Sequence, residues 1–289
     1  MHDLVLKFTD FVLDLFNSAL SFAKILVLSR PTGNTNSGNK KETAVILGNG
    51  PSLNTDLPEL IRIREQVELV CVNMFSNSPL YEQLQPENYI MLDDAFADEN
   101  HAGASLSVKN IVEKTQWPLK LYVPVRFRKK ERFRNITNSN IRIYYFNYTI
   151  FEGFEGLKFW LFDRGIAMPQ CQNVLNATVF LCVRKAYERI ILLGADHTWH
   201  EDIRLNENNE LRVYDTHFYE TQAKDISGMF LYTAGSYLKN AFLNLHKVYR
   251  SYEIIARYAA YRKVLIINSS SKSYIDVFRK VKLENEFKG

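Results

Sequence analysis

The chain has 289 residues, of which 46% are hydrophobic and 24% are charged, so it can form one large or two small globular domains with a sizeable core. Twelve glycines and eight prolines are too few for a collagen-like or low-complexity chain. The three cysteines, Cys71, Cys171 and Cys182, show no CxxC spacing and are too few for a disulfide framework, which favours a reducing cytoplasm.

The net charge of +4 is concentrated in one segment. Residues 126–134 hold six basic residues and one acid, a net charge of +5 that leaves −1 for the rest of the chain. A nucleic-acid-binding protein needs basic residues spread along a surface, so no nucleic-acid partner is expected. The segment is either a solvated surface or a contact for anionic lipid headgroups or a diphosphate-linked acceptor.

Residues 1–29 predict an amphipathic helix, and residues 30–41, which are polar and rich in Asn and Gly, predict a flexible linker. One stripe of the helix is polar: Asp3, Lys7, Asp10, Asp14, Asn17, Ser21 and Lys24. The opposite face is apolar: Val5, Phe8, Val12, Leu15, Ala19, Phe22 and Leu26. The internal charges disfavour a membrane span, and no signal-peptide pattern is present. The apolar face therefore predicts contact with a membrane surface, a second copy of the chain or the body of the protein.

The remaining residues, 42–289, predict strands that alternate with helices. Apolar runs that predict strands lie at 43–47, 68–72, 89–92, 119–123, 141–146, 189–193 and 263–267. The clearest helical patterns lie at 174–187 and 227–261. Near-continuous apolar strands separated by helices are typical of a parallel sheet covered on both faces. The sequence thus predicts a doubly wound, mostly parallel, Rossmann-like α/β domain.

Small or polar residues follow five of these strands: Gly48, Asn49 and Ser52; Asn73; Asp93 and Asp94; Asp196 and His197; Ser269 and Ser270. In open α/β sheets, ligands bind outside the carboxyl ends of the strands, where the strand order reverses. The sequence therefore predicts that these residues converge on one ligand crevice.

The first of these strand ends carries the loop GNGPSL at residues 48–53. Gly48 and Gly50 permit a tight turn and the close approach of a ligand. Pro51 and Ser52 are suited to open a helix whose free N–H groups bind a phosphate. The loop is neither GxGxxG nor a Walker loop, which excludes the common dinucleotide and P-loop classes.

The order of these motifs resembles bacterial sialyltransferases of glycosyltransferase family 42. ILGNGPSL at 46–53, followed by CVNMF at 71–75, is similar to that family's opening loop and C-N-x-F strand end. Residues 176–178, 190–196 and 266–273 resemble its TSG helix start, its GID strand end and its last nucleotide-side strand. The resemblance covers roughly residues 43–278. It extends to a superfamily with the same opening loop, which includes flagellin-modifying Maf proteins and archaeal hydroxymethylpterin diphosphokinases.

The resemblance implies one nucleotide-binding domain, a GT-A-like variant, with a helical C-terminal lid around residues 197–240. It implies an inverting glycosyltransferase that needs no metal and uses a CMP-linked donor of sialic acid or a related nonulosonic or Kdo-like acid. The acceptor is then a glycan or glycolipid in surface polysaccharide or lipopolysaccharide synthesis. The implied donor-binding residues are Gly48, Asn49, Gly50, Ser52, Asn73, Asp93, Asn176, Ala177, Thr178, Asp196, Tyr214, Ser269 and Ser270.

Histidines supply the catalytic candidates. His217, in the segment YDTHFYE, is the best match for the family's general base, and imidazole suits this task because it titrates near neutral pH. His197 is the second candidate, and His200 competes with both. The His-x-x-His pair at 197 and 200 lacks a third zinc ligand nearby and makes a weak metal site.

Asp93 and Asp94 depart from the family, which has Asn-Pro-Ser at this strand end. Two carboxylates repel a phosphate unless a cation or a hydroxyl-rich group intervenes, so a Mg²⁺ ion on Asp93 and Asp94 is a second expectation. Two alternatives therefore stay open: a Mg²⁺-dependent diphosphokinase-like transferase, and a non-catalytic nucleotide-binding scaffold. The expected location is cytoplasmic and peripheral on the inner face of the cytoplasmic membrane, with anionic lipid contacts through residues 1–29 and 126–134, or a homo-oligomer.

Overall fold

Eight parallel strands form a central sheet in the order β11–β10–β6–β1–β2–β3–β4–β5. This computed structural model describes residues 2–32, 41–220, 222, 224–225 and 238–287. The strands are β1 (Thr43–Leu47), β2 (Glu68–Val72), β3 (Asn88–Ile90), β4 (Leu119–Pro124), β5 (Ile141–Phe146), β6 (Arg189–Leu193), β10 (Leu265–Asn268) and β11 (Arg279–Lys280). The doubly wound, mostly parallel fold predicted from the sequence is confirmed.

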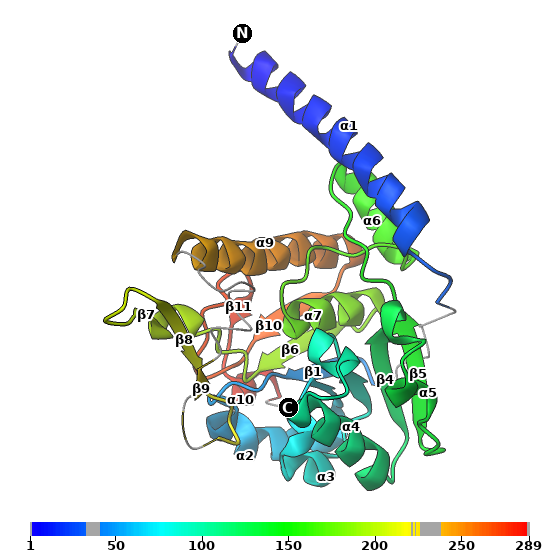
Figure 1. Cartoon of the computed structure of the whole chain (residues 1–289), viewed down its shortest axis with the longest axis vertical. Coiled ribbons are helices and arrows are strands. Elements are labelled where there is room, and N and C mark those ends of the chain that lie inside the picture. Colours follow the sequence, from blue (N-terminus) through cyan, green and yellow to red (C-terminus); the bar gives the residue numbers. More distant parts are fainter. Residues whose placement is uncertain (1, 33–40, 221, 223, 226–237, 288–289) are drawn as a thin grey trace.

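Helices cover both faces of this sheet (Figure 1). On one face lie α2 (Leu53–Ile63), α3 (Leu80–Leu84) and α4 (Ala102–Lys114), and on the other lie α6 (Glu155–Asp163), α7 (Val174–Arg184) and α9 (Leu238–Arg262). Two single-turn helices, α5 (Glu131–Arg134) and α10 (Leu283–Glu286), lie near the edges of the sheet. Residues 227–237 of the predicted second long helix lie outside the described residues.

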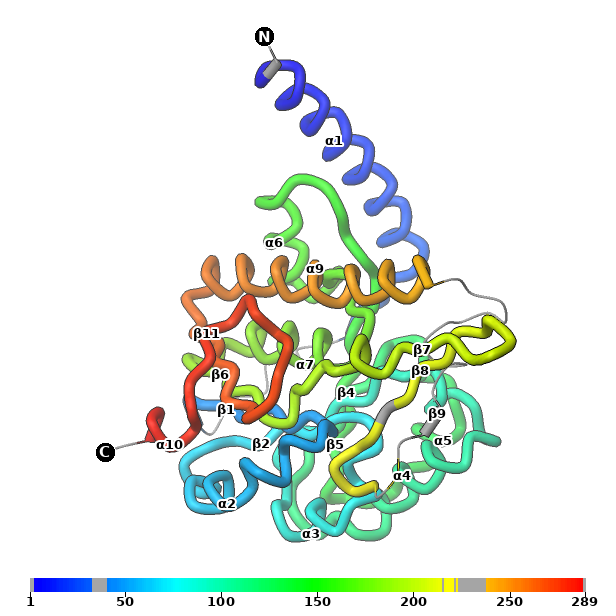
Figure 2. Tube along the Cα trace, turned by 90° about the vertical axis from the view of Figure 1, so that its left-hand side faces the viewer, coloured from blue at the N-terminus to red at the C-terminus, as the bar shows by residue number. Residues whose placement is uncertain are grey.

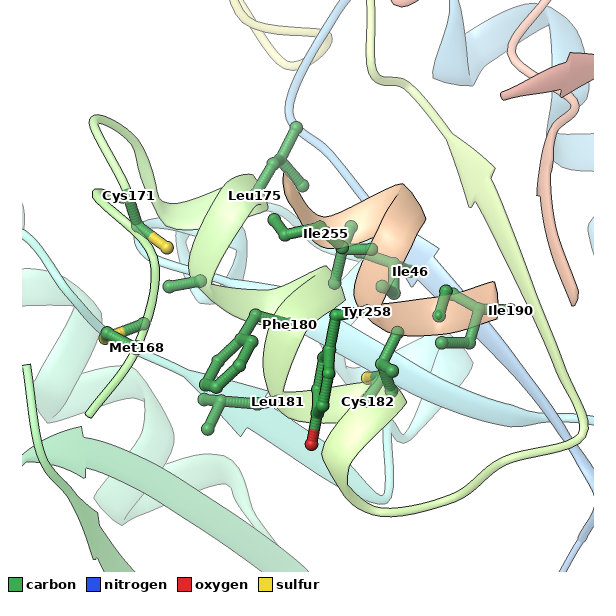
Figure 3. Packing of buried hydrophobic residues seen from close by; sticks show 14 of the residues in the cluster. Ile46, Met168, Cys171, Leu175, Phe180, Leu181, Cys182, Ile190, Ile255 and Tyr258 are labelled. Atoms are coloured by element: carbon green, nitrogen blue, oxygen red, sulfur yellow. The ribbon is translucent and has the colours of Figure 1, made fainter. Parts of the chain in front are cut away.

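The two faces of β1 bury alternate side chains, as the two-residue period of a strand requires. Ala44 and Ile46 join the core under α7 and α9, whereas Val45 and Leu47 join the core under α2, α3 and α4. Figure 3 shows the first of these cores, where Phe180 of α7 lies against Tyr258 of α9. Their ring centroids are 5.6 Å apart, and both rings are almost completely buried. These two layers fix the position of β1 and β6 at the middle of the sheet.

The strand order reverses between β1 and β6. Strands β1 to β5 follow one another toward one edge, and β6, β10 and β11 then continue from β1 toward the other edge. In an open α/β sheet this reversal leaves a crevice at the carboxyl ends of the two strands.

The N-terminal helix α1 (His2–Leu28) projects from the body of the protein (Figures 1 and 2). Part of its polar stripe faces the body, from Asp14 to Ser21. Ser21 and the neighbouring Ser18 are buried, and the hydroxyls of Ser18 and Ser21 accept hydrogen bonds from the N–H groups of Phe154 and Glu152, respectively. The predicted helix is confirmed, and the expectation that its charges disfavour a membrane span stays a prediction. Residues 3–28 contain an 18-residue apolar window with at most two charged residues, which is weak evidence because helices of soluble proteins pass the same test.

The segment around residues 197–240, predicted as a lid, contains strands in its described part. After the turn Trp199–Asp202, strands β7 (Ile203–Leu205), β8 (Leu211–Asp215) and β9 (Lys224–Asp225) form a small antiparallel sheet. The linker residues 33–40 and the lid residues 226–237 lie outside the described part of the chain.

Candidate functional site

A cavity of about 630 Å³ opens at the carboxyl ends of the central strands. Segments that follow all six strands from β1 to β6 contribute to its wall, together with the start of α7, the lid segment and α9. The polar residues that line it include Asn49, Asn73, Asp93, Asp94, Arg126, Tyr148, Gln172, Asn173, Asp196, His197, Thr198, Thr216, His217 and Asn244. Four of the five strand ends predicted from the sequence therefore meet at this cavity.

The loops after β1 and β6 are packed directly against each other. A Cβ atom on Gly48 would lie 2.3 Å from the carbonyl oxygen of Gly194, and one on Gly50 would lie 2.3 Å from Oδ1 of Asp196. Only glycine fits at both positions. The close approach that the sequence predicts at these glycines is thus an approach of the β6 loop.

The N-terminus of α2 is already occupied by a carboxylate of the protein itself. Ser52 donates two hydrogen bonds to Asp196, from its N–H to Oδ2 at 3.0 Å and from Oγ to Oδ1 at 2.5 Å. Burial raises the pKa of Asp196, and the hydrogen bonds from Ser52 oppose this rise. Ser52 does not line the cavity, and the phosphate contact expected at Ser52 from the sequence stays a prediction.

The N-terminus of α7, by contrast, faces the cavity. Gln172, Asn173, Val174 and Leu175 line it, and the Asn173 side chain caps the helix by accepting a hydrogen bond from the N–H of Asn176 at 2.8 Å. The residues predicted to hold the donor lie one turn further into the helix. Asn176, Ala177 and Thr178 are completely buried, so the helix start that faces the cavity is displaced toward Asn173.

Asn73 and Asn49 present side chains from neighbouring strand ends. Asn73 has φ +45°, a left-handed conformation that asparagine tolerates, and its Oδ1 accepts a hydrogen bond from the N–H of Leu92 at 3.2 Å. Oδ1 of Asn49 is buried and has no hydrogen-bond partner among the described residues. Because an unpaired buried acceptor costs free energy, Asn49 offers a ready partner to a ligand N–H or O–H group.

Asp93 and Asp94 do not form a metal cluster. Asp93 accepts a hydrogen bond from the N–H of Ala95 at 2.9 Å, and Asp94 pairs with Arg126 at 2.7 Å. In the part of the chain that the structure describes, no group of three His, Cys, Asp or Glu side chains is placed to hold an ion. The guanidinium of Arg126 also lies over the rings of Phe127 and Tyr148, with its carbon 4.9 Å from each ring centroid.

The structure separates the three candidate histidines. His197 is buried in the cavity wall with φ +55°, and its Nε2 lies 3.0 Å from the Tyr252 hydroxyl and 3.3 Å from Nδ2 of Asn173. Burial lowers the pKa of His197 to about 3, so its imidazole is neutral at physiological pH. His200 packs against the Tyr274 ring and does not line the cavity.

His217 lines the cavity from the lid segment and is about one-third exposed. Its Nδ1 lies 3.0 Å from Oε2 of Glu220, and its ring stacks on that of Tyr219. The neighbouring Phe218 anchors the segment, since its N–H donates to the carbonyl of Asn49 at 2.8 Å and its ring packs against Phe75. The lid therefore holds His217 beside the loop of Asn49.

The other predicted residues lie outside the cavity wall. Ser269 and Ser270 are buried behind the β6 loop, where Ser270 Oγ accepts a hydrogen bond from the N–H of Ala195 at 3.0 Å. Tyr214 lies on β8 beneath the guanidinium of Arg204. Sequence reasoning missed the roles of Tyr148, Asn173 and Asn244 in the wall, because each stands in a segment without a recognisable motif.

These features define a doubly wound α/β protein with a ligand cavity at the switch point of its sheet. Comparison with known families identifies the family: the chain matches the model described as "6-hydroxymethylpterin diphosphokinase MptE-like" over residues 21–202, and it belongs to this MptE-like family. The predicted resemblance to hydroxymethylpterin diphosphokinases is thereby confirmed at the level of this family, whereas the resemblance to family 42 stays a prediction. A comparison with curated proteins gives no match.

Among solved structures, the chain is similar to a Maf glycosyltransferase from Magnetospirillum magneticum AMB-1, with a TM-score of 0.52 and 12% sequence identity. The match covers 93% of this chain and 38% of the Maf chain, so the protein spans well under half the length of that neighbour. At this identity the likeness shows a shared fold. The names of the family and of the neighbour both describe transferases.

Proposed function

We propose that the protein is an inverting glycosyltransferase that moves a sialic acid or a related nonulosonic or Kdo-like acid from a CMP-linked donor to a glycan acceptor. The observation that carries the proposal is a cavity that is lined both by Asn49, whose buried Oδ1 has no partner among the described residues, and by the N-terminus of α7. Its volume, about 630 Å³, is in the range of small-ligand sites. The Maf neighbour, whose name describes a glycosyltransferase, supports a sugar donor over other activated groups.

In this proposal the donor phosphate binds at the N-terminus of α7, beside Asn173 and Val174. The first N–H groups of a helix and its dipole attract a phosphate, and α7 is the helix start that faces the cavity without a carboxylate of the protein on it. Asn49 then accepts a hydrogen bond from the ribose or from the cytosine amino group. Asn73 is the third residue proposed to contact the nucleotide. Ser52, Ser269 and Ser270 do not contact the donor in this proposal and instead support the loops that follow β1 and β6.

His217 is the proposed general base. Glu220 holds Nδ1 of the imidazole, which leaves Nε2 to accept a proton. The acceptor oxygen bonds to the anomeric carbon, its proton passes to Nε2 of His217, and the bond from that carbon to the CMP phosphate oxygen breaks. One such displacement inverts the configuration. His197 is a poorer base because burial keeps its pKa low. Its proposed role is to form part of the cavity wall beside the donor.

The reaction is proposed to need no metal. Asp94 is neutralised by Arg126 and Asp93 caps the turn that follows β3, so neither carboxylate is arranged with a third ligand among the described residues. The alternative, a Mg²⁺-dependent diphosphokinase, is favoured by the name of the family, and it predicts that a nucleoside triphosphate with Mg²⁺ binds best. The proposed location is the cytoplasmic face of the membrane, as a peripheral protein.

A thermal-shift panel separates these functions. CMP, CDP, UDP, GDP and ATP are each added with and without Mg²⁺ at about 100 times a typical dissociation constant, which stabilises a binding protein by about 2.7 kcal/mol. For a chain of this length the melting temperature then rises by about 5 °C. The proposal predicts the largest rise with CMP, independent of Mg²⁺. A larger rise with ATP and Mg²⁺ favours the diphosphokinase. A larger rise with UDP or GDP contradicts the proposal that the donor is linked to CMP.

A further inference from the structure

The helix α1 docks on the body with its polar side. Ser18 and Ser21 are buried against Gly153 and its neighbours, where a Cβ atom on Gly153 would lie 2.1 Å from Oγ of Ser18 and 2.8 Å from the carbonyl oxygen of Asp14. Gly153 also has φ +121°, so only glycine permits this contact. Only the part of the polar stripe from Asp14 to Ser21 thus packs within the protein, flanked by the rings of Phe11 and Phe22, which contact Phe154 and Phe151. The opposite side of the helix has no such contacts with the body among the described residues.

That opposite side forms an exposed apolar arc. Fourteen of the 25 exposed large apolar side chains in the described part of the chain lie on α1: Leu4, Val5, Leu6, Phe8, Phe11, Val12, Leu13, Leu15, Phe16, Leu20, Phe22, Leu26, Val27 and Leu28. At about 100° per residue they span roughly 260° of the helix circumference. An exposed apolar surface of this size marks an interaction site.

The width of the arc indicates lipid rather than a second copy of the chain. A paired helix covers a stripe of about 100°, which would leave more than half of this arc in water. A bilayer interface covers the whole outward side of a helix that lies in its plane, with the polar stripe turned toward water. On α1 the polar stripe is the side turned toward the body.

The charges and aromatic groups beside α1 fit the headgroup region of an anionic bilayer. Nη2 of Arg128 donates to the carbonyl of Pro31 at 3.1 Å, which places the basic segment 126–134 at the end of α1. Lys129 and Lys130 of that segment are exposed. On α6, which lies beside α1 in both views, Trp160 is 45% exposed under the guanidinium of Arg164 (Figures 1 and 2). Basic residues and tryptophan are the usual anchors at a membrane surface.

The end of α1 is also bonded to the wall of the cavity. Ser29 donates to Oγ1 of Thr149 at 2.8 Å, and the N–H of Arg30 donates to Oδ1 of Asn147 at 2.9 Å. Between these two residues stands Tyr148, which lines the cavity beneath Arg126. A surface that binds α1 therefore also fixes the position of the side of the cavity that Tyr148 lines.

We propose that α1 lies in the plane of an anionic lipid bilayer with its apolar arc among the acyl chains, and that this docking turns the Arg126–Tyr148 side of the cavity toward the headgroups. Resting on the proposed function, the acceptor is then a lipid-linked glycan whose anionic headgroup approaches Arg126 from the bilayer.

Vesicle flotation tests the docking with the full chain. Wild-type protein is expected to float with vesicles that contain phosphatidylglycerol. The variant Val5→Ser/Phe8→Ser/Val12→Ser, changed at the centre of the arc, is expected to lose at least tenfold in partition coefficient. A matched control, Asp3→Ser/Lys7→Ser/Asp10→Ser, places the same three serines on the polar stripe and keeps its binding. A wild-type protein that stays at the bottom of the gradient, or an arc variant that floats as well as wild type, overturns the docking.

A fluorescent label tests the orientation. The three native cysteines are buried, so a polarity-sensitive dye on Lys129→Cys reports the basic segment, and one on Lys109→Cys reports α4, which lies at the end of the body away from α1 (Figure 1). Vesicles are expected to shift the emission of the first to the blue and leave the second unchanged. Equal shifts, or a shift at Lys109→Cys alone, overturn the orientation. The CMP thermal shift is measured separately. A protein that binds vesicles but shows no thermal shift with CMP therefore contradicts the proposed transferase activity and leaves the membrane docking standing.

Discussion

Replacing Ser52 by alanine separates the structural role of this residue from the nucleotide contact that its motif predicts. The change removes the 2.5 Å hydrogen bond from Oγ to Asp196 and leaves the 3.0 Å bond from the N–H group in place. A hydrogen bond to a charged group contributes about 1.5–3 kcal/mol, and Asp196 is 5% exposed, so water replaces the lost donor poorly. We expect Ser52→Ala to lower the free energy of unfolding by about 2 kcal/mol and the melting temperature by about 4 °C.

The loss should depend on pH with a defined sign. Burial already raises the pKa of Asp196, and removal of a Ser52 hydrogen bond, which lowers that pKa, raises it further. The folded variant therefore binds a proton more readily than wild type. Its deficit is largest at neutral pH, where the carboxylate is charged, and shrinks as the pH falls and the carboxyl group takes up a proton.

Urea unfolding of both proteins at pH 7 and pH 4.5 measures these differences. Ser251→Ala is the matched control, because Ser251 is also buried, but the hydrogen bond that its hydroxyl makes within the described residues is a long one, to Sγ of Cys171 at 4.0 Å. Ser251→Ala should lower the free energy of unfolding less than Ser52→Ala does at both pH values, and its effect should not depend on pH. An equal deficit for Ser52→Ala at the two pH values would refute the assignment of Ser52 to Asp196, as would a stable variant with a tenfold loss of CMP affinity.

Three further variants and conditions test the site. His217→Ala should cut turnover by 10²–10⁴-fold and leave CMP affinity unchanged, and a variant that keeps more than a third of the wild-type rate means that the base lies elsewhere. The pKa of His197, lowered from 6.5 to about 3, predicts stability that is complete above pH 6.5 and declines as the pH falls, by up to about 1.4 kcal/mol per unit. His197→Gln should flatten this decline in urea midpoints measured from pH 7 to pH 4. Turnover should be unchanged in EDTA, since Asp94 pairs with Arg126; loss of activity that Mg²⁺ restores would contradict a metal-free reaction.

The sequence predicts the sheet well because its strands are apolar on both sides. Thr43–Leu47, Glu68–Val72 and Arg189–Leu193 have the predicted bounds, since each run is bounded by small or polar residues. Residues 203–215, in the predicted lid, are mainly polar and contain no such run, so the small antiparallel sheet there could not be foreseen.

The site was predictable in its location but less so in its contacts. Strand ends meet wherever a parallel sheet is formed, which is why Asn49, Asn73, Asp93 and His197 reach one cavity. A motif cannot tell whether a polar group faces a ligand or another part of the protein. Ser52 is an example. Its hydroxyl donates a hydrogen bond to Asp196, which lies in a loop 144 positions further along the chain.

The contacts of α1 show the same limit of prediction from sequence. Its polar stripe was predictable from a period of three to four residues, but the choice between docking on the body and an external interface was not. The structure shows that α1 docks through Ser18 and Ser21, with Phe11 and Phe22 against the rings of Phe154 and Phe151, while most of the apolar side stays exposed. The two expectations apply to opposite faces of one helix.

The central claim, that the cavity between β1 and β6 binds a CMP-linked donor, is tested most directly by a crystal structure of the protein soaked with CMP. The account predicts CMP between Asn49 and the start of α7, with its phosphate beside Asn173 and Val174 and a polar group of the nucleoside on Oδ1 of Asn49. CMP bound at another place, or an empty cavity at saturating CMP in crystals that leave it open, would contradict it.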